Sequence, residues 1–223
     1  MTELNVDEIR QQDRAPGWHP LMQPSLLDKR DLMVVQEGNG ATLIDAEGNR
    51  YLDGGAGLWN VNVGYGRQEI ADAVYAQIQQ LPFYPLSQIN VPATRLATRL
   101  AELLPGNLQH LFFCNSGSEA NETALKMARL YATRRASAAG DDGAAAPRRI
   151  ACFSGAFHGR TMGALSCTPT AKYQEPFAPL IPEIEALPYN DADAARKVLD
   201  GSFCGVIVEV VQGEGGLDRM TDA

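Results

Sequence analysis

A turn of small and polar residues, Ser116, Gly117 and Ser118, lies between an apolar segment and a helical pattern. The apolar segment, residues 111–114, has the composition of a short buried strand. Ser116 with Glu119 three residues later fits a capping box, which marks the start of a helix. A helix N-terminus offers free N–H groups and a positive dipole, and serine hydroxyls can add to them. The turn is therefore a candidate anion site.

The local pattern alone leaves two interpretations of this turn open. One is the anion site, and the other is an ordinary strand–helix turn in which Ser and Gly act only as caps. No Gly-Lys-Ser/Thr follows the glycine, so the turn is not a P-loop, and no G-x-G-x-x-G dinucleotide fingerprint is present. A phosphate site of another kind remains open.

Two later apolar segments, residues 150–153 and 205–211, also end in residues that could do chemistry. These residues are Phe157, His158 and Arg160 after the first segment, and Glu209 and Gln212 at the end of the second. Strands that alternate with helices give a mainly parallel sheet, and ligands bind beyond the carboxyl ends of such strands. We therefore expect the three strand ends to converge on one crevice.

The elements that must position these residues follow from periodicity and turn signals. Helices are expected over residues 6–12, 68–81, 92–104, 161–167 and 192–199, besides the helix that begins after Ser116. Within that helix Glu122 and Lys126 are spaced as a favourable pair, and Arg134 and Arg135 mark its expected end. Residues 32–36, 41–45 and 50–53 have the pattern of an antiparallel meander.

The expected domain organisation has two parts. Residues 1–66 would form an N-terminal segment with the meander, and residues 67–223 the first part of a large α/β domain, with residues 136–149 as a surface loop. The β-branched run at residues 205–211 predicts a buried strand covered on both faces. Trp59 lies in a glycine-rich segment as either an aromatic wall or a plug under the meander, and the plug is favoured.

Composition limits the function classes. The chain has 223 residues, 45% of them hydrophobic and 21% charged, which is typical of a soluble globular protein. A net charge of −8 argues against a nucleic-acid partner, and no apolar run reaches the length of a membrane span. The polar N-terminus is not a signal peptide, and the histidines lack metal-ligand spacing. The four cysteines (Cys114, Cys152, Cys167 and Cys204) fit buried thiols in a reducing compartment, so a cytoplasmic protein is expected.

Three motifs in order, NSGSEANETALKMAR, FSGAFHGRTMGALS and VIVEVVQGEGG, resemble the class III aminotransferases, which are pyridoxal 5'-phosphate (PLP) enzymes of fold type I. LIDAEGNRYLDGGAGLWNVNVGYG is also similar, so the resemblance runs from about residue 34 to the end. It implies an α/β fold in which helices sandwich a mainly parallel sheet. The sheet and a small C-terminal domain would be incomplete in this chain.

The resemblance also implies roles for the cofactor-binding residues. Residues 116–118 match the turn that holds the cofactor phosphate, and Phe157 matches the aromatic residue that stacks on the pyridine ring. His158 and Gln212 would lie in the cofactor site, His158 in support rather than in proton transfer.

Three positions match residues that select the substrate in different members. Arg160 matches an arginine that grips the substrate carboxylate as a fork, although a solvated surface arginine is the alternative. Glu209 matches an acidic residue beside the cofactor that governs which carboxylate enters in ornithine- and acetylornithine-type members. Trp59 instead is similar to a pocket residue of the ω-amino acid:pyruvate members. These positions point to different subgroups, so the substrate stays open.

PLP chemistry also needs a Schiff-base lysine and an acid on the pyridine nitrogen. In the class III family, each of these two residues lies in a motif of its own. None of the acidic or basic candidates in this chain matches either motif: Lys29, Lys126, Lys172, Lys197 and Asp222. We therefore expect no catalytic residue here, and a fragment that is inactive alone. The parent would be a homodimer that moves an amino group from an amino acid or ω-amine to a 2-oxo acid. The alternatives are a decarboxylase or racemase of the same fold, or a non-catalytic shortened homologue.

Overall fold

The computed structural model describes residues 5–14, 16–20, 22–23, 25, 31–141 and 146–221. The chain divides into two compact units, residues 1–94 and 95–223, and the division falls inside helix α5 (Val91–Leu103). The domain boundary expected after residue 66 stays a prediction. The two units are described separately.

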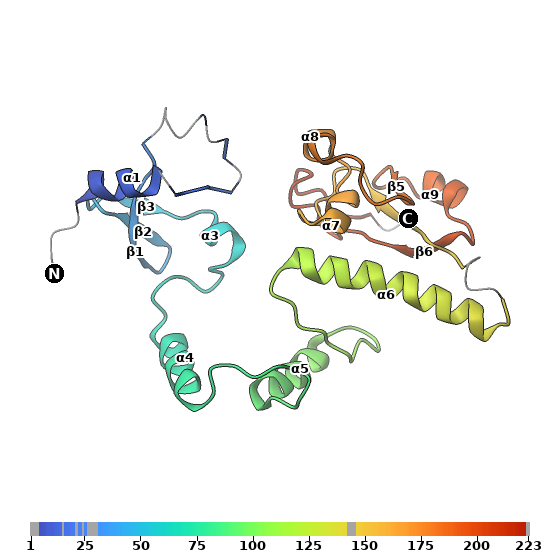
Figure 1. Ribbon diagram of the computed structural model, residues 1–223, viewed down its shortest axis with the longest axis horizontal. Coiled ribbons are helices and arrows are strands. Elements are labelled where there is room, and N and C mark those ends of the chain that lie inside the picture. Colours follow the sequence, from blue (N-terminus) through green and yellow to red (C-terminus); the bar gives the residue numbers. More distant parts are fainter. Residues whose placement is uncertain are drawn as a thin grey trace. The chain divides into compact units, whose positions relative to one another are not determined.

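The first unit contains helix α1 (Val6–Arg14) and a three-stranded antiparallel sheet (Figure 1). Its strands are β1 (Val35–Asn39), β2 (Thr42–Asp45) and β3 (Arg50–Leu52), and each pairs with the next. The predicted meander is therefore confirmed, with its first strand starting three residues later than expected.

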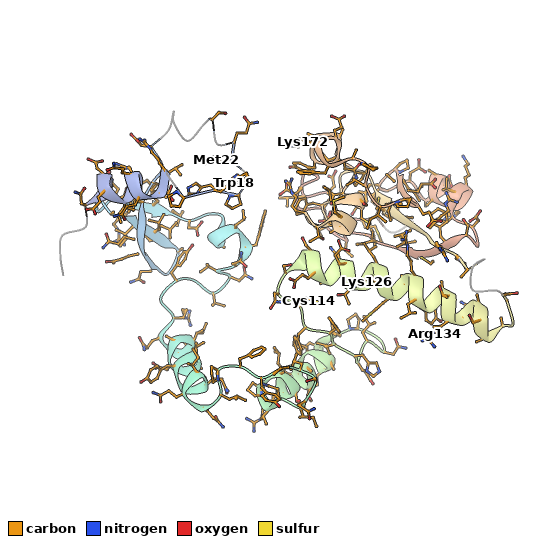
Figure 2. The ribbon with its side chains drawn as sticks, viewed as in Figure 1. Trp18, Met22, Cys114, Lys126, Arg134 and Lys172 are labelled. Atoms are coloured by element: carbon orange, nitrogen blue, oxygen red, sulfur yellow. The ribbon has the colours of Figure 1, made fainter. Side chains whose placement is uncertain are left out.

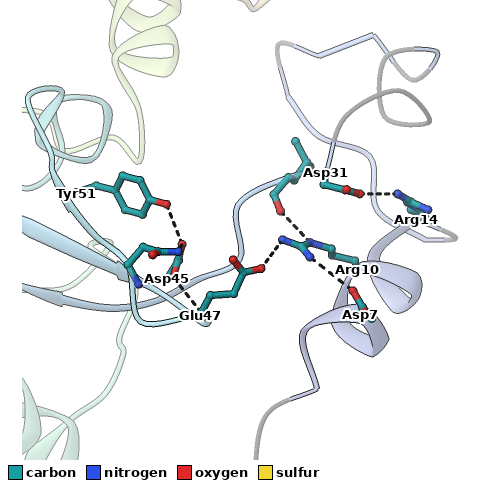
Figure 3. Close-up of polar contacts among 9 residues, drawn as sticks. Asp7, Arg10, Arg14, Asp31, Asp45, Glu47 and Tyr51 are labelled. Atoms are coloured by element: carbon teal, nitrogen blue, oxygen red, sulfur yellow. Dashed lines mark hydrogen bonds and ion pairs between the residues drawn. The ribbon is translucent and has the colours of Figure 1, made fainter.

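A buried carboxylate fixes the turn between β2 and β3. Asp45 accepts hydrogen bonds from the Asn49 backbone (2.8 Å) and side chain (3.0 Å) and from the Tyr51 hydroxyl (2.9 Å). These bonds, led by the Asn49 side chain, hold the pKa of Asp45 below its ordinary value. In Figure 3, Arg10 of α1 reaches Glu47 in the same turn at 3.0 Å, which ties α1 to the sheet.

Helices α4 (Gln68–Gln80) and α5 confirm the two helical patterns that follow the glycine-rich segment. The apolar stripe of α4 stays exposed, because no described residue covers Ile70, Val74 or Ile78. Periodicity therefore predicted the helix correctly, although its partner surface is not among the described residues.

The second unit is built on a parallel sheet with strand order β5-β4-β6. Its elements are α6 (Gly117–Ala138), β4 (Arg149–Phe153), α7 (Met162–Ser166), α8 (Ala171–Gln174), the 3-10 helix η2 (Glu175–Phe177), β5 (Ile184–Leu187), α9 (Ala192–Val198) and β6 (Phe203–Val206). Helix α6 packs along β6 and α7 (Figure 1). The core gathers around Ile150, Cys152, Leu165 and Leu187. The prediction of a mainly parallel sheet is confirmed.

Two predicted strands differ in the structure. Residues 111–114 form no strand, because no described strand pairs with them, and Phe112 is exposed. The second predicted strand, residues 205–211, is shorter than expected. It corresponds to β6, which ends at Val206, and residues 207–211 continue without regular strand pairing. Val206, Val208 and Val210 are exposed, so the expected cover on both faces is wrong for this edge strand. Strand β5, in the proline-rich stretch, was not predicted.

Helix α6 is longer than its sequence signals suggested. It continues past Arg134 and Arg135 to Ala138, so residues 136–138 of the expected loop are helical. Residues 142–145 of that loop lie outside the described part of the chain. Glu122 forms no ion pair with Lys126, because its carboxylate binds backbone N–H groups of α7 instead.

The four cysteines are free thiols. Burial raises the pKa of Cys152 to about 12 and that of Cys167 to about 11, whereas Cys114 and Cys204 are only half-buried. Within the described ranges, no helix has the length and apolar character that a membrane span requires.

Candidate functional site

The N-terminus of α6 forms the capped turn that the sequence predicted. Ser116 has extended backbone angles (φ −152°, ψ 161°), and its Oγ accepts a hydrogen bond from the Glu119 N–H at 3.2 Å. The Glu119 carboxylate reaches back to the Asn115 N–H at 2.7 Å, one residue before the N-cap. The capping prediction is confirmed, and the reciprocal bond is displaced by one residue.

Two backbone donors at this turn are free. The N–H groups of Gly117 and Ser118 begin the helix and bond to no acceptor in the described part of the chain. A Cβ added to Gly117 would meet nothing within 4 Å, so the chain's own packing does not require glycine there. Free donors, a helix dipole and open space above Gly117 together suit an anion that approaches the backbone closely.

One face of α6 also anchors the loop that follows β4. The side chains on this face, spaced i, i+3 and i+4, are Ser118, Asn121 and Glu122. Ser118 Oγ accepts from the Arg160 N–H at 3.1 Å. Asn121 Nδ2 donates to the His158 carbonyl at 2.6 Å, and Glu122 Oε1 accepts from the Gly163 N–H at 2.6 Å. The first two motifs are thus joined by hydrogen bonds.

Two glycines allow this close docking. A Cβ added to Gly159, whose φ is +128°, would lie within 3.0 Å of Ser118 Oγ, and one added to Gly163 would overlap the Glu122 carboxylate. The backbone of residues 158–164 can therefore approach α6 only because both positions lack a side chain.

The third motif joins the same cluster. The Phe157 N–H donates to Glu209 Oε2 at 2.8 Å, and Gln212 Nε2 donates to the Ser154 carbonyl at 2.9 Å. These bonds bring the segments after β4 and β6 together, and the Arg160 N–H links the first of them to Ser118 of α6. The three motifs converge as predicted, but only two of them follow strands, because residues 111–114 before α6 form no strand.

His158 is buried beneath this loop with only 6% of its surface exposed. The His158 backbone N–H donates to Thr168 Oγ1 at 2.8 Å, but the Nε2 of the imidazole ring has no hydrogen-bond partner in the described part of the chain. Burial lowers the pKa of the imidazole, and the charge of Glu209 opposes that shift in part. The ring is therefore neutral near neutral pH.

Folding stability is expected to fall on acidification because of His158. Its pKa is lower in the folded state than the ordinary value of about 6.5, so below that pH the unfolded chain binds a proton that the folded chain excludes. Between about pH 7.5 and about pH 5.5, the wild type should lose about 1 kcal/mol more unfolding free energy than His158→Gln. Denaturant titrations at both pH values measure this difference. Equal losses in the two proteins would contradict the buried neutral imidazole.

Arg160 lies beside two aromatic rings. Its guanidinium carbon is 3.9 Å from the centroid of the Tyr173 ring and 5.5 Å from that of Phe157. No carboxylate in the described part of the chain pairs with it. The arginine is exposed, but its guanidinium contacts two aromatic rings, which distinguishes it from a freely solvated surface residue.

Comparison with known proteins identifies the family. Residues 27–223 match the class-III aminotransferases. The chain belongs to the class-III aminotransferase family.

Individual members are similar over nearly the whole chain. Acetylornithine aminotransferase of Methanopyrus kandleri is 40% identical over 83% of this chain and 44% of its own length. The uncharacterized aminotransferase YhxA of Bacillus subtilis is 37% identical over 94% of the chain and 48% of its own length. The crystal structure of an (S)-enantioselective omega-transaminase from Thermomicrobium roseum is also similar, with a TM-score of 0.85 and 33% sequence identity. The match covers 100% of the present chain and 53% of the transaminase chain. The chain thus spans about half the length of the curated relatives it matches.

The family's fold is the PLP-dependent fold type I, and its cofactor is PLP. Two observations fit the phosphate end of that cofactor and its surroundings. The free donors and open space at Gly117 suit a phosphate group, and the buried, unpartnered Nε2 of His158 is an unmet polar group beside the same loop.

In the first unit, Trp59 lies in a strained left-handed turn. Helix α3 (Ala56–Trp59) has φ values of 47° at Ala56, 55° at Leu58 and 65° at Trp59, which are costly for residues with a side chain. Asp53 stabilises the turn by accepting from the Gly57 N–H and the Tyr65 hydroxyl, both at 2.7 Å. The Trp59 ring is 67% exposed, so the plug interpretation is wrong.

The described lysines lie on helices. Figure 2 shows Lys126 on α6 and Lys172 on α8, and Lys197 belongs to α9. Lys29 and Asp222 lie outside the described residues. The lysine of the family's chemistry is therefore not assigned to any of the three described positions.

Sequence reasoning missed the residues that connect the motifs. Asn121, Glu122 and Tyr173 make contacts that no single motif reveals. The i, i+3, i+4 spacing of Ser118, Asn121 and Glu122 was a usable signal, because it places three polar side chains on one helix face. Nothing in the sequence pattern indicated the ring of Tyr173.

Proposed function

We propose that the whole protein is a PLP-dependent aminotransferase that moves an amino group from an amino acid or ω-amine to a 2-oxo acid. The observation that carries this proposal is the hydrogen-bonded cluster of Ser118, Arg160, Phe157 and Glu209 at the free end of α6. In a member of the class-III family, this cluster supports a cofactor site. PLP, when bound, supplies the electron sink for the reaction.

The N-terminus of α6 would hold the cofactor phosphate. The N–H groups of Gly117 and Ser118 are free to donate, and the Ser116 hydroxyl can add a third donor. Ser118 Oγ accepts from the Arg160 N–H, which leaves its own proton available for a phosphate oxygen. Each bond to a charged phosphate contributes about 1.5–3 kcal/mol.

Phe157 would cover the cofactor ring and exclude water from it. Glu209 positions Phe157 by accepting its N–H, and the Phe157 ring meets Tyr173 edge-to-face with centroids 6.3 Å apart. Gln212 would support the loop from below through Ser154. We retain Glu209 as a specificity residue as well, because its carboxylate belongs to the same cluster.

Arg160 would bind the carboxylate of the amino donor. Its guanidinium has no protein carboxylate as partner in the described part of the chain, so its N–H groups can form a fork with a ligand. Similarity to acetylornithine aminotransferase supports a carboxylate-bearing donor. We retain Trp59 as a substrate-binding residue, because its exposed side chain is free to contact a ligand. The homodimer and the cytoplasmic location are further proposals, supported by the uncovered stripe of α4 and by the free thiols.

Replacing Arg160 with Ala should raise the KM for carboxylate-bearing donors by about 10- to 100-fold, because a charge-assisted fork is lost. Simple primary amines should be nearly unaffected. Steady-state assays of the PLP-loaded protein with both donor classes measure this difference, and Arg134→Ala, at an exposed site on α6, is the matched control. Equal losses for both donor classes would remove the proposed role of Arg160.

A further inference from the structure

We propose that Tyr173 is a positioning residue that holds the Arg160 guanidinium for the carboxylate of the amino donor. This inference rests on the proposed role of Arg160. Its basis is the geometry around the Tyr173 ring, which receives the Arg160 guanidinium carbon at 3.9 Å and the Lys172 Nζ at 4.7 Å from its centroid.

Stacking uses the face of the guanidinium and leaves its edges free. A carboxylate is bound through the N–H groups at those edges, so a ring on the face and a carboxylate at the edge do not compete. An unrestrained arginine loses much rotamer entropy when it binds a ligand. A ring that already holds the guanidinium lowers that cost, so the fork is prepared before the substrate arrives.

The helix that carries the Tyr173 ring is anchored to its neighbour. Tyr173 lies in α8, whose neighbouring Gln174 donates from Nε2 to the carbonyls of Leu165 (3.0 Å) and Ser166 (3.2 Å) in α7. Helix α7 is in turn bound by Glu122 of α6. The platform under Arg160 is thus connected by hydrogen bonds to the helix whose N-terminus forms the phosphate site.

Lys172 adds a second positive charge against the same ring. Neither Lys172 nor Arg160 forms an ion pair with a carboxylate in the described part of the chain. Two unneutralised cations on one ring favour an anionic group of the ligand at this place. The ligand chemistry that fits is a carboxylate of the amino donor.

The test compares Tyr173→Leu with Tyr173→Phe in the whole PLP-loaded protein. Tyr173→Leu should raise the KM for a carboxylate-bearing donor by about 2- to 30-fold, with a much smaller change in kcat and in the KM for a simple amine. Tyr173→Phe keeps the ring and should restore the wild-type KM within about twofold. A similar loss for both donor classes in Tyr173→Leu would overturn the inference.

A second variant separates electrostatics from folding. Pentafluorophenylalanine at position 173 keeps the shape of the ring but removes its negative face, so it should reproduce the higher carboxylate KM even if Tyr173→Leu fails to fold. A wild-type KM in this variant would contradict the inference. Arg160→Ala, assayed in parallel, distinguishes the two failures. If only Arg160→Ala loses carboxylate preference, Tyr173 is not a positioning residue, and if Arg160→Ala keeps that preference, the proposed role of Arg160 fails first.

Discussion

Replacing Gly159 with Ala should cost about 3 kcal/mol of folding stability, the largest loss expected in the second unit. The backbone of Gly159 has φ +128°, a region that residues with a side chain rarely adopt. The new methyl group would also overlap Ser118 Oγ and lie 3.1 Å from the Ala164 Cβ. Strain and overpacking therefore add at one position, and the loop of residues 158–164 must move away from α6.

Denaturant unfolding midpoints measure this loss, and Gly140→Ala is the matched control. Gly140 also has a positive φ, +86°, but a Cβ there would meet nothing within 4 Å. The control should therefore lose only about 1–2 kcal/mol from backbone strain. Removing the obstructing hydroxyl in Gly159→Ala/Ser118→Ala should recover part of the difference. If Gly159→Ala is no less stable than Gly140→Ala, the loop does not dock on Ser118.

Replacing Ser118 with Ala should weaken PLP binding by about 10- to 100-fold. The variant removes a hydroxyl donor from the proposed phosphate site and also the acceptor for the Arg160 N–H. Both effects act on the cofactor site, because the loop that carries Phe157 loses one of its bonds to α6. The rate at which PLP is lost on dialysis, followed by its absorbance, measures the effect.

Ser137→Ala is the matched control for that measurement, because Ser137 is exposed near the other end of the same helix. The control should retain PLP as the wild type does. Unchanged retention in Ser118→Ala would leave the turn as a helix cap only, which is the alternative that the local sequence pattern also allowed.

Local signals predicted the parts of the fold that depend on neighbouring residues. The cap at Ser116 and the short helix α7 form largely from contacts within a few residues, so their sequence patterns sufficed. Strand β4 pairs with distant strands, but its apolar run between turn signals still marked it. Burial was less predictable, because it depends on which partners cover an apolar face. Residues 111–114 and Val206 are apolar in sequence, yet they lack a covering layer among the described residues.

The candidate site was predictable in its residues and not in its connections. Motif order pointed to Phe157, Arg160 and Glu209, and strand topology explains why they converge. The contact between Arg160 and Tyr173 joins the loop after β4 to helix α8, and no periodicity predicts such a contact. Trp59 was misjudged because it ends four consecutive residues of positive φ, Ala56 to Trp59, a backbone state that propensity disfavours, and its side chain is exposed.

The backbone at Gly117 is the proposed binding site for the phosphate of PLP, and the proposed function depends on this phosphate site. Its most direct test is to titrate wild type and Gly117→Ala with PLP and with pyridoxal, which lacks the phosphate. A Cβ at Gly117 meets no protein atom within 4 Å, so the unfolding midpoint of the variant should be no lower than that of the wild type. We expect Gly117→Ala to bind PLP at least about tenfold more weakly while its affinity for pyridoxal is unchanged. Equal PLP affinity in the two proteins, or an equal loss for both ligands, would contradict the phosphate site.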